Sequence, residues 1–236
     1  SDGAGTSGLG VTSVGSQTIN VSGNVYQVAQ PAFASTTVNL GNVRVGGTAQ
    51  QAVGITNTNV SPAGFQEGLS ASIGGATGGI SANGNFTNLA AGGTNNSALV
   101  VGLNTASAGA RTGSATVNLV STGDGTSGLA DLGLGTQTIN VSGNVYQVAA
   151  GQLNTASLNF GTVQVGQSVS QLLSISNIAT GAAGYVEDLN ARFGATSGTG
   201  ANLISGTGQI ANLLAGSTNA SGMTVNVNTG SASTID

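Results

Sequence analysis

The stretch QTINVSGNVYQVA occupies residues 17–29, and the same thirteen residues recur at 137–149. Apolar side chains alternate with polar ones along it, at Ile19, Val21 and Val25, and such alternation is typical of a half-buried β-strand. The second copy closes a run of similar segments, whereas the first copy opens the chain. We interpret the stretch as the last strand of a β-domain that occurs more than once.

A tandem repeat of about 120 residues extends on both sides of this strand. The matching segments are 38–59 with 158–179, 65–74 with 185–194, and 88–105 with 212–229. A period of this size is too long for a solenoid unit and fits a globular domain. We therefore expect three parts: a closing strand at 1–29, a complete domain at 30–149, and a domain at 150–236 that lacks its last strand.

Alternating apolar segments recur throughout both repeats, separated by glycine-rich turns, and no segment has the period of an amphipathic helix. The predicted fold is all-β: tandem immunoglobulin-like antiparallel sandwiches of about seven strands each, with almost no helix. The alternation also predicts the cores. They comprise Val43, Val53, Ile55, Leu99, Val101 and Val117 in one sandwich and Val163, Leu173, Ile175, Met223 and Val225 in the other.

The composition excludes several classes of protein. Leu, Ile, Val and Phe supply 56 of the 236 residues, enough for a packed core. The three basic residues, Arg44, Arg111 and Arg192, lie far apart in the sequence and cannot neutralise a run of phosphates, so we expect no nucleic-acid partner. No apolar run approaches the roughly 20 residues that span a bilayer, so we expect no membrane insertion in this segment. A chain without Lys, His or Cys suits an extracellular location.

Catalysis has few candidate groups here. A serine nucleophile would find no conventional base, because His, Lys and Cys are absent. Glu67 and Glu187 occupy equivalent positions in separate repeats, so they do not form a carboxylate pair in one cleft. We expect Arg111 to pair with Glu67 and Arg192 to pair with Glu187. The chain is predicted not to be an enzyme and to need no metal or cofactor.

Two glycine-rich segments, GAGTSG at 3–8 and GDGTSG at 123–128, match the spacing of a dinucleotide-binding loop. Such a loop requires a helix after the glycines, and an alternating strand follows each of these segments instead. We interpret both as turns between strands.

Four motifs in order, VNLGNVRVGGTAQQAVGITNTN, LAAGGTNNSALVVGLNT, RTGSATVNLVS and GTQTINVSGNVYQVA, resemble the bacterial choice-of-anchor D repeats, which are related to the ASH/HYDIN immunoglobulin-like domains. The resemblance covers essentially the whole chain. It lacks the aromatic–proline step that often follows the LaaG turn in that family. The resemblance implies an immunoglobulin-like sandwich in secreted or surface-anchored bacterial proteins, without catalytic activity.

The two ends of the sequence complement each other. Asp236 aligns with Leu119 and Ser1 aligns with Ser121, so the repeat that breaks off at one end of the sequence continues at the other. Residues 16–29 are therefore expected to lie as a strand in the second sandwich of a neighbouring copy. Neighbouring copies are either separate subunits or successive units of one longer polypeptide. Both arrangements give a head-to-tail assembly of copies of this chain.

The predicted function is that of a structural subunit or repeat unit of an extracellular bacterial filament or surface layer. The alternative is a stalk in a large surface adhesin. The residues predicted to form the assembly interface are Ile19, Val21, Val25, Tyr26, Val28 and Tyr146. For the two tyrosines, a contact to the next domain and a cover over the edge of their own sandwich remain alternatives.

Overall fold

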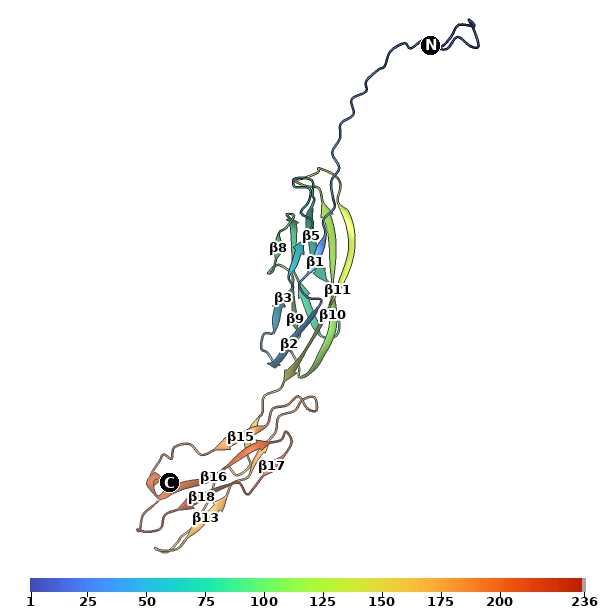
Figure 1. The fold of residues 1–236 in the computed structure, drawn as a ribbon. Helices are drawn as coiled ribbons and strands as arrows, with labels where there is room; N and C mark the ends of the chain where they lie inside the picture. Colours follow the sequence, from blue (N-terminus) through green and yellow to red (C-terminus); the bar gives the residue numbers. More distant parts are fainter. Residues whose placement is uncertain (235–236) are drawn as a thin grey trace.

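The computed structural model describes residues 1–234. The first sandwich contains eleven strands, of which β10 and β11 are the longest (Figure 1). Their bounds are Pro31–Phe33 (β1), Thr37–Arg44 (β2), Gln50–Ala52 (β3), Ile55–Asn57 (β4), Gly68–Gly74 (β5), Ile80–Asn83 (β6), Asn85–Leu89 (β7), Thr94–Asn95 (β8), Val100–Leu103 (β9), Gly109–Thr122 (β10) and Leu132–Tyr146 (β11).

Two layers enclose the core of this sandwich. One layer is a five-stranded sheet in the order β2-β11-β10-β5-β7. The other consists of the sheets β1-β4-β8 and β3-β9-β6, which continue each other because β3 leads directly into β4 and β8 into β9. Val53 N, between β3 and β4, donates to Leu99 O at 2.8 Å and joins the two small sheets.

The pairing of β2 departs from the expected antiparallel arrangement. β11 pairs antiparallel with β10 but parallel with β2, in the register Val141↔Val38 and Val145↔Val43. The reason is that β1 and β2 belong to one extended run that begins in the opposite layer, where β1 pairs with β4. The run then crosses to the edge of the five-stranded sheet, and its direction there is parallel to β11.

The second sandwich is built from fewer strands. They are Gly151–Leu153 (β12), Val169–Leu172 (β13), Ile175–Asn177 (β14), Leu189–Arg192 (β15), Ile204–Leu213 (β16), Thr218–Asn219 (β17) and Met223–Val227 (β18), with one short 3₁₀ turn at Ala201–Leu203 (η1). They form the sheets β13-β18-β16-β15 and β12-β14-β17. The chain is thus all-β, and the predicted fold class of immunoglobulin-like sandwiches is confirmed.

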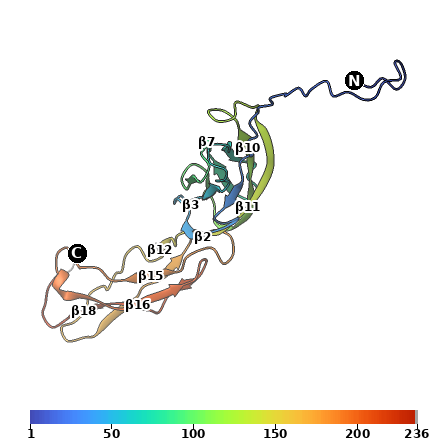
Figure 2. The same ribbon diagram turned by 45° about the horizontal axis from the view of Figure 1, so that its top comes forward.

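The two sandwiches follow each other along an elongated molecule, and the first residues project from the opposite end of the first sandwich (Figures 1 and 2). Within residues 1–234, no helix is long and apolar enough to cross a membrane.

The core of the first sandwich agrees with the prediction at most positions. Val53, Ile55, Leu99, Val101 and Val117 are all buried, and Val43 is half-buried against them. They pack with residues from both layers. The other fully enclosed side chains include Leu69, Ala115, Ile139, Val141 and Val145.

The core of the second sandwich is smaller than predicted. Met223 is buried with Ile210 and Leu213, and Leu173 and Ile175 pack against them while only half-buried. Two of the predicted positions differ: Val225 is half-buried, and Val163 is 37% exposed, so its assignment to the core was wrong. The physical reason is that residues 157–164, the counterpart of β2, form no strand here and do not close over the core.

Candidate assembly interface

The N-terminal segment carries an apolar strand sequence with nothing packed on it. Residues 8–26 form no strand, and Ile19, Val21 and Val25 are 84%, 90% and 87% exposed. Figure 1 shows this segment leading away from the first sandwich. Tyr26 is half-buried and Val28 is 42% exposed, so contact with the sandwich begins at the end of the repeated stretch.

The identical sequence inside the first sandwich has the opposite burial. In β11, Ile139, Val141 and Val145 are 0%, 2% and 0% exposed, because they enter the core between β10 and β2. The two copies of the sequence therefore differ in exposure because a sandwich surrounds residues 137–145 and none surrounds residues 17–25. The segment at 17–26 has the sequence of a core strand and no core of its own within the described chain.

Each copy of the repeated stretch ends in the same backbone joint with the domain that follows. Gln27 N donates to Phe65 O at 2.8 Å, and Gln27 O accepts from Glu67 N at 2.9 Å. Gln147 repeats this joint with Tyr185 and Glu187, at 2.8 Å for both hydrogen bonds. The N-terminal segment thus meets the first sandwich as β11 meets the second.

The two predicted interface tyrosines lie at these joints. The ring of Tyr26 is 5.4 Å from that of Phe65, and the ring of Tyr146 is 5.5 Å from that of Tyr185, both tilted by about 50°. Each tyrosine lies at the same position of the repeated stretch, and its partner belongs to the domain that follows. The contact is between consecutive units.

An ion pair also crosses the boundary between the sandwiches. Arg44 Nε, at the end of β2, donates to Glu187 Oε1 at 2.8 Å, with the two side chains 66% and 33% exposed. The hydrogen bond and the negative charge of Glu187 raise the pKa of the Arg44 guanidinium. Because the position corresponding to Arg44 in the second repeat is Gln164, this pair is specific to the junction after the first sandwich.

Neither expected local ion pair is present. Arg111 donates from Nε to Asn104 O at 3.0 Å, where it stabilises a turn, and Arg192 is exposed on β15. Glu67 is instead 4% exposed and accepts hydrogen bonds from Ser121 Oγ at 2.6 Å and Ser127 Oγ at 2.7 Å. The expectation was wrong because the fold brings two serines to the Glu67 carboxylate, and Glu187 pairs with Arg44 of the preceding sandwich.

The second sandwich is open where the first is closed by β10, β11 and β2. Of the five strands in the large sheet of the first sandwich, only β5 and β7 have counterparts among residues 1–234. These counterparts are β15 and the end of β16. They pair through Leu189↔Leu213, as β5 and β7 pair through Leu69↔Leu89. Consequently Leu189 remains half-buried while Leu69 is completely buried. The sheet that would cover this half of the core is not formed within the described residues.

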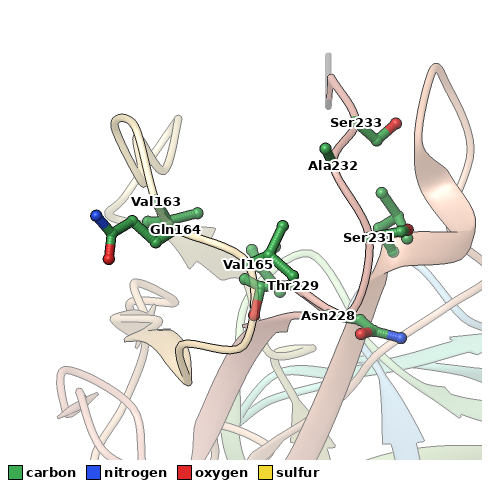
Figure 3. A pocket seen from close by; sticks show the side chains of 10 residues that line it. Val163, Gln164, Val165, Asn228, Thr229, Ser231, Ala232 and Ser233 are labelled. Carbon is green, nitrogen blue, oxygen red and sulfur yellow. The ribbon is translucent and has the colours of Figure 1, made fainter.

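A groove marks this opening. A hollow of about 420 Å³ is lined by Leu158, Phe160 and Val163 on one side and by Val227 and Thr234 on the other. Beside it, Val163 and Val165 face the segment from Asn228 to Ser233 across a smaller hollow (Figure 3). The Val163 and Val165 side chains are 37% and 61% exposed. The groove thus combines apolar side chains with the β2 counterpart, whose backbone has no β-sheet partner within residues 1–234.

No other constellation in residues 1–234 suggests a chemical site. No group of three or more acidic or other metal-ligating side chains comes together there. The turns at 3–8 and 123–128 lead into extended segments without a helix, as interpreted from the sequence. The candidate site is therefore defined by the interface residues Ile19, Val21, Val25, Tyr26, Val28 and Tyr146. Sequence reasoning missed the serines around Glu67 and the pairing of Glu187 with Arg44.

Two solved structures show a distant similarity to this chain. The chain is similar in structure to the ASH/PapD-like domain (PapD-like domain 7) of human CEP192, with 8% identity, 58% of this chain and 98% of that chain covered, and a TM-score of 0.36. A tandem pair of titin immunoglobulin domains matches with 8% identity, 86% and 83% coverage, and a TM-score of 0.23. No protein-family model and no curated protein matches the sequence.

Proposed function

We propose that this chain is the structural repeat unit of an extracellular bacterial filament or surface layer, in which residues 16–29 of one copy complete the second sandwich of the next. Copies are arranged head to tail, either as separate subunits or as successive units of one polypeptide. The chain has no enzymatic role in this proposal. The extracellular setting rests on the absence of Lys, His and Cys, and the bacterial one on the family resemblance of the sequence.

The observation that carries the proposal is the burial difference between two identical strands. Val141 is 2% exposed in β11, and Val21, its counterpart in the same thirteen-residue sequence, is 90% exposed. The first sandwich thus contains a template of how the stretch is used. Residues 17–26 would adopt the same position if a sandwich of the same repeat offered them a vacant edge.

The second sandwich offers such an edge. Its β2 counterpart, residues 157–164, runs along the groove without a β-sheet partner among residues 1–234, and Val163 and Val165 are exposed beside it. Unpaired backbone groups on a strand edge favour pairing with an added strand. Burial of Ile19, Val21 and Val25 in this position contributes on the order of 5 kcal/mol before the cost of ordering the segment.

Electron microscopy of the unchanged chain and of two substituted variants tests this proposal. The full chain at increasing concentration is expected to form linear assemblies, and a variant with Ile19, Val21 and Val25 all replaced by Asn is expected to remain monomeric. The matched control is replacement of Ser16, Asn20 and Asn24 by Ala on the opposite, polar face of the same segment. A triple apolar variant that assembles like the unchanged chain would refute strand completion.

The alternative function, a spacer stalk in a surface adhesin, uses the same sandwiches without association between chains. The ion pair and the tilted contact between the Tyr146 and Tyr185 rings suit a stalk, because they hold consecutive sandwiches in a defined relation. Native material that appears as single beaded chains, with no change on dilution, favours the stalk. Fibres that dissociate on dilution favour separate subunits.

A further inference from the structure

The buried carboxylate in the first sandwich is held by a loop that occurs a second time at the N-terminus. Glu67 accepts hydrogen bonds from Ser121 Oγ at 2.6 Å and Ser127 Oγ at 2.7 Å, and Ser121 Oγ in turn accepts from Ala29 N at 2.8 Å. Residues 123–128 form the turn that places Ser127 over the carboxylate. The end of β10 is thereby fastened to the joint between the two units.

In the second sandwich, the groups equivalent to the Glu67 carboxylate and the Ala29 N–H have no serine partners within residues 1–234. Glu187 is the counterpart of Glu67, and its side chain is 33% exposed with Arg44 as its partner. Ala149 is the counterpart of Ala29, and within residues 1–234 its N–H makes no hydrogen bond, whereas Ala29 N donates to Ser121. The Glu187 carboxylate and the Ala149 N–H are thus both available for further hydrogen bonds at the joint.

The matching donors lie in the exposed N-terminal segment, which already has the required local shape. Gly8 N donates to Gly3 O at 2.9 Å, as Gly128 N donates to Gly123 O at 2.8 Å. In both turns the last glycine has a positive φ, 64° at Gly8 and 70° at Gly128. Ser7 therefore occupies the position in its turn that Ser127 occupies beside Glu67.

We propose that Glu187 is the docking acceptor for the N-terminal turn of a second copy, with Ser7 Oγ of that copy donating to the Glu187 carboxylate and Ser1 Oγ accepting from Ala149 N. This proposal rests on the strand completion proposed above and specifies its polar contact. Arg44 remains bound to the other side of the carboxylate, which has about four lone-pair directions to offer.

This contact determines the register of the added strand. A slip of one residue turns Ile19 and Val21 to the wrong face, so alternation alone excludes it. A slip of two residues keeps the apolar face inward but moves the turn by about 6.6 Å, well beyond hydrogen-bond distance. The contact between Ser7 and Glu187 therefore disfavours a slip of two residues, which burial of the apolar side chains alone would allow.

A synthetic peptide of residues 1–28 provides the test. The acceptor is the full chain with Ile19, Val21 and Val25 replaced by Asn, which disables its own donor strand, and binding is measured by calorimetry. A Ser7→Ala peptide is expected to bind about tenfold more weakly, because a hydrogen bond to a charged group is lost. A Ser16→Ala peptide is the control, since its counterpart Thr136 is exposed in β11, and it is expected to bind like the unchanged peptide.

A double-mutant cycle separates this contact from local effects of the serine on the turn. The unchanged peptide is expected to bind a Glu187→Gln acceptor more weakly than it binds the acceptor with Glu187. On the Glu187→Gln acceptor, the Ser7→Ala change in the peptide is expected not to weaken binding by a further factor of about ten. If the peptide binds but the two changes multiply independently, the Ser7–Glu187 contact is refuted while strand completion stands. If the unchanged peptide does not bind at all, strand completion itself is refuted.

Discussion

Asn57 and Asn177 occupy the same position in the two sandwiches, and both side chains are completely buried. Asn57 Nδ2 donates to Glu67 O at 3.1 Å and Leu89 O at 3.2 Å, and its Oδ1 accepts from Gln30 N at 3.0 Å. Asn177 makes the corresponding bonds, to Glu187 O at 3.2 Å, Leu213 O at 3.1 Å and from Ala150 N at 3.1 Å. One amide in each unit therefore joins three backbone segments near the inter-unit joint.

Replacement of Asn57 by Leu is expected to destabilise the first sandwich by roughly 3 kcal/mol or more. The volume is nearly conserved, but two carbonyls and one N–H lose their partner in a buried place, and each such group costs about 1–3 kcal/mol. Urea denaturation of the full chain measures the effect. Asn118→Ala, on the exposed face of β10, is the control and should change stability by less than about 0.5 kcal/mol.

The same substitution in the two identical strands is expected to have different consequences. Val141→Asn places an amide in the core of the first sandwich, and we expect a loss of folding stability of about 3 kcal/mol. Val21→Asn changes a side chain that is 90% exposed, so the unfolding midpoint of dilute monomer should stay constant while assembly weakens. A Val21→Asn chain that assembles normally would contradict the proposed function.

The fold could be predicted from the sequence because its evidence is local. Alternation of apolar residues gave the strands, and the repeat gave two domains of one kind; Val53, Leu99 and Val117 were correctly assigned to the core on this basis. Val163 fails because its burial depends on a neighbouring strand and not on its own segment. Alternation reports which face a side chain occupies and carries no information on whether a sheet covers that face.

The polar contacts could not be predicted for a related reason. Ser121 and Ser127 are more than fifty residues from Glu67, and serine is too common in this chain for any one of them to be singled out. The Arg44–Glu187 pair likewise depends on how one sandwich meets the next. Such contacts follow from the tertiary arrangement. The available signal in the sequence was that Glu67 and Ser127 recur at the repeat spacing, as Glu187 and Ser7.

The junction between the sandwiches is expected to depend on Arg44 for its orientation and not for its stability. The Arg44 side chain is 66% exposed, so Arg44→Gln should leave the unfolding midpoint nearly unchanged. Residual dipolar couplings should show a wider range of inter-sandwich orientations, and about 1 M salt should produce the same effect in the unchanged chain through screening. A Gln167→Ala change, away from the junction, serves as the control.

The pH dependence of this contribution follows from its direction. The hydrogen bond and charge of the Glu187 carboxylate raise the pKa of Arg44, so from neutral pH up to the ordinary pKa of arginine the interaction favours the folded arrangement. On the alkaline side the interaction is lost as pH rises through the raised value, in strong alkali. Between neutral pH and pH 9, titration of Arg44 should therefore have no effect on the inter-sandwich orientation measured by the same couplings.

Residues 157–164 are expected to become a strand when the second sandwich is completed. Their counterpart β2 is a strand through its parallel pairing with β11, with Val38 opposite Val141 and Val43 opposite Val145. In the chain with Ile19, Val21 and Val25 replaced by Asn, hydrogen-exchange mass spectrometry should therefore show slow exchange in 157–164 only after the 1–28 peptide is added, with no change in β2. Protection that appears in β2 and not in 157–164 would mean that the added strand binds the first sandwich. Because the first sandwich already holds its own copy of the strand, we expect the new protection in the second.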